Sequence, residues 1–233
     1  MSTYNKINVA VIGATGYTGL DLTLMLSKHP KIFIKNLCAT KNLGKKISYF
    51  DKRIKSKLPR ITSIDTIDWS KLNLIFLSLP NGEAQKIIKK NYYKNTAIKY
   101  IDLSADFRIH DSKVYEKNYK IKHKAKKLIK ESIYLIPELN KKIDIQKRII
   151  ANPGCYPTSI QIPLVPLIKD DLINTKYITI DSKSGFSGAG KNIKSKFNHK
   201  NLYSSTYAYN VKNHRHICEI DQELFKLTNK KIK

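Results

Sequence analysis

A short apolar run followed at once by three evenly spaced glycines constrains this chain more than any other feature. Residues 7–12 (Ile-Asn-Val-Ala-Val-Ile) are typical of a buried parallel strand. Gly13, Gly16 and Gly19 come next, and the leucine-rich residues 20–28 predict a helix. A strand, a glycine turn and a helix in this order predict a backbone cradle for a phosphate group at a helix N-terminus. A tight turn without a ligand is the alternative, because the spacing is G-x-x-G-x-x-G rather than G-x-G-x-x-G.

Apolar runs and helical segments continue to alternate beyond this turn. Further strands are expected over residues 32–38, 72–79, 98–103, 148–151 and 177–182, and further helices over residues 83–91 and 156–168. Pro163 and Pro166 are expected to kink or shorten the last helix. The alternation predicts an α/β fold with a mostly parallel sheet covered on both faces. A change of pattern after Leu139 places a domain boundary between residues 147 and 148.

The charge of the chain suggests a nucleic-acid partner at first. Lys and Arg number 44 against 18 Asp and Glu over 233 residues, which gives a net charge of +26. Only five of these basic residues are Arg, the side chain that specific readers of nucleic acid favour. The lysines are scattered, and the densest run, residues 122–130, has no interleaved aromatic residue. We therefore interpret the charge as a chain-wide excess of lysine and expect no nucleic-acid partner.

Cysteine usage and hydropathy limit where the protein works. Three cysteines at no metal-like spacing argue against a disulfide framework and a metal site, and they fit a reducing cytoplasm. No apolar run approaches the ~18 residues of a membrane helix. Nothing before Ile7 resembles a signal or transit peptide. We expect a cytoplasmic protein without a membrane partner.

Cys155 is the candidate nucleophile of the chain. It follows the turn Asn152-Pro153-Gly154 and begins a predicted helix. The helix dipole and the free N–H groups there favour a thiolate and could hold an oxyanion. A small packing residue is the alternative. His214-Arg215-His216, followed by Glu219, offers the acid/base that a thiolate needs, with a surface or structural histidine as the alternative for either residue.

Two further segments carry candidate binding groups. Thr40 and Lys41 follow the second predicted strand, where an NAD-specific fold usually has a carboxylate, so they favour the 2′-phosphate of NADP. Ser104-Ala105-Asp106-Phe107-Arg108 follows the strand over residues 98–103. The guanidinium of Arg108 could clamp a substrate carboxylate or phosphate, and a surface ion pair with Asp106 is the alternative.

Six segments together resemble the N-acetyl-gamma-glutamyl-phosphate reductases, which belong to the aspartate-semialdehyde dehydrogenase superfamily. These segments are GATGYTG (residues 13–19), IDLSADFR (101–108), IPELN (136–140), ANPGCYPT (151–158), SGFSGAGK (184–191) and HRHICEI (214–220). The resemblance implies a Rossmann-like dinucleotide-binding domain over residues 1–147. An α+β catalytic and dimerisation domain would follow over residues 148–233, and we expect it to be incomplete, because the family normally continues further.

The resemblance also implies an activity and roles for individual residues. The reaction would be the NADPH-dependent reduction of N-acetyl-L-glutamyl 5-phosphate to the 5-semialdehyde, with release of phosphate, in arginine biosynthesis. Cys155 would be the nucleophile, His216 the acid/base with His214 as the competing choice, and Glu219 their support. Ser104, Arg108 and Asn152 would bind substrate. NADP(H) would be held by Gly13, Thr15, Gly16, Tyr17, Thr18, Gly19, Thr40, Lys41, Ser184, Gly185, Ser187 and Gly188, and a homo-oligomer is expected.

The chain departs from the family at two positions. Asn81 stands where the family usually has His, and Cys218 stands where it usually has Pro. One alternative is a related acyl-phosphate reductase that acts on aspartyl or aminoadipyl phosphate. Another is an inactive, shortened protein that is retained for binding.

Overall fold

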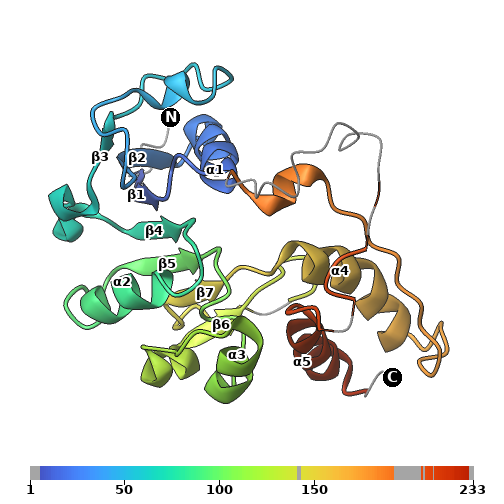
Figure 1. The fold of residues 1–233 in the computed structure, drawn as a ribbon. Helices are drawn as coiled ribbons and strands as arrows, with labels where there is room; N and C mark the ends of the chain where they lie inside the picture. The colour runs from blue at the N-terminus through green and yellow to red at the C-terminus, as the bar shows by residue number, and fades with distance from the viewer. Residues whose placement is uncertain (1–5, 141–142, 192–205, 207, 212, 231–233) are drawn as a thin grey trace. The chain divides into compact units, whose positions relative to one another are not determined.

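The computed structural model describes residues 6–140, 143–191, 206, 208–211 and 213–230, and it divides the chain into two compact units. The first unit comprises residues 1–153 and the second residues 154–233. The division falls at residue 153 rather than 147 because the strand over Ile149–Ala151 pairs within the sheet of the first unit. Figure 1 labels the helices and strands.

The first unit is built on a seven-stranded parallel sheet. Its strands are β1 (Ile7–Ile12), β2 (Ile32–Cys38), β3 (Ile61–Thr62), β4 (Leu74–Leu77), β5 (Lys99–Asp102), β6 (Ser132–Tyr134) and β7 (Ile149–Ala151). Their order in the sheet is β3-β2-β1-β4-β5-β7-β6, and every pair is parallel. The predicted α/β fold with a parallel sheet is confirmed; sequence reasoning missed the short strands β3 and β6.

Helices and short 3-10 turns connect these strands. The helices of the first unit are α1 (Tyr17–Lys28), α2 (Ala84–Asn91) and α3 (Ser112–Tyr119), and its 3-10 turns are η1 (Ile47–Tyr49), η2 (Ile64–Thr66), η3 (Trp69–Lys71) and η4 (Lys126–Glu131). α1 ends where His29-Pro30 cannot continue a helix, as expected. η4 lies within the lysine-rich run and buries Leu128 and Ile129, so this run is only partly a solvated face.

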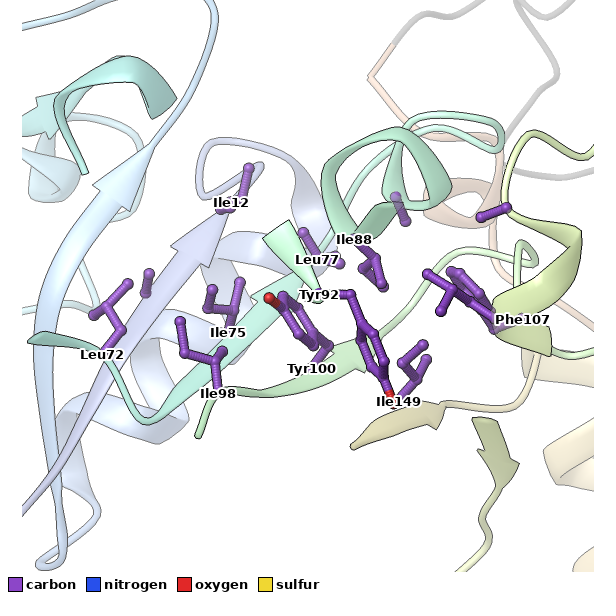
Figure 2. Packing of buried hydrophobic residues seen from close by; sticks show 14 of the residues in the cluster. Ile12, Leu72, Ile75, Leu77, Ile88, Tyr92, Ile98, Tyr100, Phe107 and Ile149 are labelled. Carbon is purple, nitrogen blue, oxygen red and sulfur yellow. The ribbon is translucent and has the colours of Figure 1, made fainter. Parts of the chain in front are cut away.

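Alternate residues of β1 pack into two separate hydrophobic clusters. Val9 and Val11 of β1 pack with α1 in one cluster. Ala10 and Ile12 of the same strand pack with α2 and with β4 and β5 in the other cluster. Figure 2 shows this second cluster, in which Ile88 of α2 lies over the strands. The period of two along β1 therefore covers both faces of the sheet, as a buried parallel strand requires.

The second unit contains two helices that pack against each other, α4 (Cys155–Lys169) and α5 (Ile217–Thr228), and the 3-10 turn η5 (Phe186–Ala189). Of the two expected effects of the prolines on α4, shortening does not occur, because the helix runs through Pro163 and Pro166; a kink stays a prediction. Both prolines lie on the exposed face of α4. Proline has no N–H, so the carbonyl four residues before each proline has no donor within the helix. Both of these carbonyls belong to exposed residues, and water can hydrogen-bond to them.

The strand expected over residues 177–182 does not form. This segment is largely exposed, with Tyr177 88% accessible, and no strand in the described part of the second unit pairs with it. An isolated strand cannot satisfy its backbone groups by itself. α5, which sequence reasoning missed, begins after His216 and ends at Asn229 in a left-handed conformation. None of the helices in the described residues has the length and apolar character needed to span a bilayer.

Candidate active site

The glycine turn after β1 is shaped by two glycines that no other residue could replace. Gly13 has a φ of +88°, and a Cβ there would stand 2.0 Å from the backbone oxygen of Ser78. A Cβ on Gly19 would stand 2.2 Å from the backbone oxygen of Gly13. These two positions let the turn reverse sharply and let α1 lie close to β1.

Gly16 differs, because its φ of −71° is open to any residue and no atom of the described residues crowds the position of a Cβ. A Cβ there would meet its nearest neighbour at 3.5 Å, an ordinary van der Waals contact. Gly16 is the N-cap of α1, which has no side-chain cap and no acidic residue in its first turn. The space over Gly16 and the positive end of α1 fit the pyrophosphate of a dinucleotide. The neighbours Thr15, Tyr17 and Thr18 line the same turn.

Thr40 and Lys41 lie beside this cradle. The N–H groups of Gly13 and Ala14 both donate to the carbonyl oxygen of Cys38, at 2.9 and 3.0 Å. The glycine turn is therefore fixed to the end of β2, directly before Thr40 and Lys41, and both of these side chains are exposed. A hydroxyl and an ammonium group thus stand where an NAD-specific fold has a carboxylate.

The segment after β5 is held by a buried carboxylate. Asp106 is fully buried and accepts hydrogen bonds from the N–H groups of Gly82 (2.7 Å) and Gln85 (3.0 Å) at the start of α2. It also accepts from the Tyr115 hydroxyl at 2.7 Å. Asp106 is committed to these donors in the interior, so the surface ion pair considered for it is wrong.

Arg108 joins this segment to the turn after β7. Its Nε donates to the carbonyl oxygen of Asn152 at 2.7 Å, and its Nη2 donates to that of Leu103 at 2.8 Å. Arg108 is only 6% exposed, whereas the side chain of Asn152 is exposed. Ser104 is buried and its Oγ accepts from the N–H of Asp106 at 3.2 Å. Ser104, Arg108 and Asn152 therefore lie together, and their contact with substrate stays a prediction.

Asp102, the last residue of β5, is a buried carboxylate beside Ser104 that was not among the predicted site residues. It is fully buried, and its Oδ1 accepts from the N–H of Ser104 at 2.9 Å. Its Oδ2 has no hydrogen-bond partner among the described residues. Burial, and then the neighbouring Asp106, raises the pKa of Asp102 to about 7. A carboxylate at a strand end was visible in the sequence, but its burial was not.

Cys155 is the exposed cysteine of the three, and all three are free thiols. It is the first residue of α4, whose N-cap Gly154 provides no side chain. The N–H of Gly154 donates to Oε1 of Glu219 at 2.8 Å, and Glu219 is fully buried. By contrast, burial raises the pKa of Cys38, and it raises the pKa of Cys218 to about 11. Position therefore favours Cys155 as the nucleophile.

Both candidate histidines lie against the residue that follows Cys155. The Tyr156 ring lies 5.3 Å from the ring of His214 and 6.1 Å from that of His216, measured between centroids. The two imidazoles are 4.9 Å apart. Glu219, one turn into α5, holds the peptide before Cys155 as described above. The structure thus brings Cys155, His214, His216 and Glu219 into one cluster around Tyr156 and Gly154, and their catalytic roles stay predictions.

Tyr209 also belongs to this cluster, and no sequence signal identified it among 14 tyrosines. Its ring lies 5.4 Å from that of His214 and 6.3 Å from that of Tyr156. Burial, a hydrogen bond with Tyr156 and the nearby charge of Cys155 raise its pKa above the ordinary value. This effect of Cys155 on the pKa of the phenol indicates that Tyr209 lies near the candidate nucleophile.

The remaining predicted residues, Ser184, Gly185, Ser187 and Gly188, lie in and before η5 and are exposed. This segment is joined to α4 through the hydroxyls of Ser182 and Ser159, which are 2.9 Å apart. Ser159 lies one helical turn after Cys155. A contact of these four residues with a cofactor stays a prediction.

Comparisons with known proteins agree with this geometry. The model of the semialdehyde dehydrogenase NAD-binding domain matches residues 8–147, and that of the semialdehyde dehydrogenase dimerisation domain matches residues 155–233. The N-acetyl-gamma-glutamyl-phosphate reductase of Ehrlichia canis (strain Jake) is 44% identical over 222 residues, which are 94% of this chain and 63% of that protein. The enzyme of the same name from Afipia carboxidovorans is 39% identical over 231 residues, 97% of this chain and 65% of that protein.

The chain thus spans just under two thirds of the length of these curated relatives. Among solved structures, aspartate semialdehyde dehydrogenase II from Vibrio cholerae, complexed with ASA, shares the fold. Its TM-score is 0.61 at 17% identity, with 97% of this chain and 67% of that chain covered. Because the NAD-binding domain alone accounts for more than half of its residues, this protein belongs to the semialdehyde dehydrogenase family.

Proposed function

We propose that this protein catalyses the NADPH-dependent reduction of N-acetyl-L-glutamyl 5-phosphate to N-acetyl-L-glutamate 5-semialdehyde, with release of phosphate. The observation that carries the proposal is an exposed Cys155 at the uncapped N-terminus of α4, next to a tyrosine that contacts two histidines. The relatives named above carry the name of this reductase and support the choice of substrate.

Cys155 performs the first half of the reaction. Its thiolate attacks the carbonyl carbon of the acyl phosphate, the C–O bond to phosphate breaks, and phosphate leaves with the electron pair, which yields a thioester. The oxyanion formed during attack lies at the N-terminus of α4, where backbone N–H groups and the helix dipole stabilise negative charge. Glu219 fixes the Gly154 peptide and with it the start of this helix.

The second half needs a hydride and proton transfers. When bound, the reduced nicotinamide supplies the hydride that turns the Cys155 thioester into a thiohemiacetal. The imidazole that took the Cys155 proton returns it to the oxygen of this adduct. It removes that proton again as the aldehyde forms and the thiolate leaves. A histidine next to Tyr156 is suited to this exchange, since its imidazole accepts and donates protons near neutral pH.

We infer that NADPH rather than NADH is the physiological dinucleotide. The cradle over Gly16 suits a pyrophosphate, and the exposed hydroxyl of Thr40 and ammonium of Lys41 suit a 2′-phosphate. Arg108 would support the substrate site by fixing the carbonyl of Asn152, whose exposed amide is available to substrate. Residues 184–188 would complete the cofactor site.

We also propose that the protein works as a homo-oligomer in a reducing cytoplasm. The match of residues 155–233 to a dimerisation domain supports self-association. Three free thiols, one of them exposed at the proposed nucleophile, suit a compartment that keeps cysteines reduced.

The test is the reverse reaction with the 233-residue chain. We expect NADP⁺ reduction that requires both N-acetylglutamate 5-semialdehyde and inorganic phosphate, and that is lost in Cys155→Ala. Cys218→Ala is the matched control, because that thiol is half-buried and donates to the carbonyl oxygen of Arg215 at 3.2 Å. Faster turnover of aspartate or aminoadipate semialdehyde would instead assign a related acyl-phosphate reductase. Dinucleotide binding without turnover of any of the three aldehydes would leave only a binding protein.

A further inference from the structure

We propose that His214 is a positioning residue, held as the neutral tautomer with its proton on Nε2, and that His216 alone is the acid/base. The proposal rests on the proposed function and divides the labour between the two histidines of the HRH segment. It also assigns a role to Tyr209, whose hydroxyl lies at the other nitrogen of His214.

The first observation is a hydrogen bond within the segment. The backbone N–H of His216 donates to Nδ1 of His214 at 3.2 Å. An imidazole nitrogen that accepts a hydrogen bond carries a lone pair and no proton. The single proton of the neutral His214 ring is therefore on Nε2. His216 is the N-cap of α5, so this bond satisfies a backbone donor at the start of that helix.

The second observation concerns the opposite nitrogen. Nε2 of His214 lies 3.5 Å from the hydroxyl oxygen of Tyr209, which can accept its proton over a long hydrogen bond. The hydroxyl of Tyr209 in turn shares a hydrogen bond with Tyr156. The His214 ring thus has a partner at each nitrogen, and the aromatic rings of Tyr156 and Tyr209 contact it from α4 and from the preceding loop.

Acid/base work by His214 would break this arrangement. A second proton would have to enter at Nδ1, where it would face the N–H of His216 and remove its acceptor. The environment opposes the same step, because burial and then the charge of Arg215 lower the pKa of His214. The titratable groups that contact or act on this ring are Tyr156 on α4, Tyr209 on the loop, and Arg215 and His216 on its own segment.

His216 is held by its peptide, because its backbone N–H donates to Nδ1 of His214. Both imidazoles lie near the Tyr156 ring, at 5.3 Å for His214 and 6.1 Å for His216, and Nδ1 of His214 is occupied by the backbone N–H of His216. Fixing the peptide fixes the direction in which the His216 ring leaves the chain. His214 therefore acts on the reaction through His216.

The test compares variants that separate accepting a hydrogen bond from carrying a proton. In His214→Asn the amide oxygen can still accept from a backbone N–H two residues on, as in an Asx turn, but the side chain cannot serve as an acid or base. We expect His214→Asn to keep kcat within about tenfold of the parent with the same pH profile, and His214→Ala to lose more. His216→Asn should lose about 10²- to 10⁴-fold in kcat, together with the limb of the profile that reports the imidazole.

A second measurement does not depend on turnover. Nitrogen chemical shifts of the His214 ring, followed by NMR against pH, should show the Nε2–H tautomer and protonation only below the usual range of histidine. Tyr209→Phe should leave Nδ1 unprotonated but change the Nε2 shift. The proposal is overturned if His214→Asn loses the imidazole limb while His216→Asn keeps it, or if the neutral ring carries its proton on Nδ1. If the parent chain turns over none of the aldehydes, the proposed function fails and the NMR result decides this proposal separately.

Discussion

Replacing Asp102 by Asn should stabilise the first unit relative to the parent protein, and this stabilisation should be larger at alkaline pH than at acid pH. Asp102 is fully buried at the end of β5, and only its Oδ1 has a hydrogen-bond partner among the described residues. Its pKa rises from the ordinary value of 3.8 to about 7, because burial and Asp106 disfavour the charged form more than the hydrogen bonds from Ser104 and the charge of Arg108 favour it. Ionisation of Asp102 in the folded protein is therefore costly.

The sign follows from proton binding in the two states. Between the unfolded pKa and the folded pKa, the folded protein holds a proton that the unfolded chain has released, so stability falls as pH rises through this window. Raising the pKa of Asp102 to about 7 corresponds to about 4 kcal/mol of unfolding free energy, at ~1.36 kcal/mol for each tenfold change in the proton equilibrium. About 3 kcal/mol of this is lost between pH 5 and pH 8.

The assay is urea unfolding of the parent and of Asp102→Asn at both pH values. Trp69, the single tryptophan, packs against the core of the first unit, so its fluorescence reports the unfolding of that unit. The stability of the variant relative to the parent should rise by about 3 kcal/mol from pH 5 to pH 8. Asp144→Asn, an exposed aspartate in the same unit, is the matched control for removing a surface charge. A relative stability that is unchanged or falls over this range would refute the reasoning.

Three further predictions concern the first unit. Gly16→Ala should weaken NADPH binding in a fluorescence titration while changing the free energy of unfolding by less than about 1 kcal/mol. Gly19→Ala, by contrast, should destabilise the fold in urea unfolding, because the new Cβ would stand 2.2 Å from a backbone oxygen. Equal losses of stability in the two variants would contradict the assignment of Gly16 to ligand approach. Lys41→Glu should raise KM for NADPH about tenfold or more and KM for NADH less, in steady-state kinetics with both dinucleotides; a parallel rise would remove Lys41 from the 2′-phosphate site. Tyr115→Phe removes a donor to the buried Asp106 carboxylate and should cost about 1 to 3 kcal/mol of unfolding free energy, and an unchanged urea midpoint would show that this bond carries little stability.

Sequence reasoning succeeded where a local pattern decides the structure. Strands β1 and β2 and the end of α1 were predicted to the residue, because buried parallel strands are continuous apolar runs and Pro30 prevents the helix from going on. Cys155, His214 and His216 could be chosen as candidates because cysteine and histidine pairs are scarce in this lysine-rich chain, and their roles stay predictions.

Sequence reasoning failed where tertiary contacts decide. Residues 177–182 have the composition of a strand, yet a strand needs a neighbour to bind its backbone, and local sequence does not supply one. A surface ion pair of Arg108 with Asp106 was one alternative, and it is excluded because both residues are buried; the contact of Arg108 with substrate stays a prediction. Tyr209 and Asp102 stand out only through their surroundings, the rings of Tyr156 and His214 for Tyr209 and burial for Asp102, which local sequence does not reveal.

The central claim is that Cys155 receives the acyl group, and trapping the thioester tests it most directly. The 233-residue chain would be mixed with N-acetylglutamyl 5-phosphate without dinucleotide, quenched in acid, and examined by intact mass and peptide mapping. The account predicts one N-acetylglutamyl group on Cys155 for each phosphate released, retained in Cys218→Ala and absent in Cys155→Ala. Phosphate release without an acyl group on Cys155, or acylation that persists in Cys155→Ala, would contradict it.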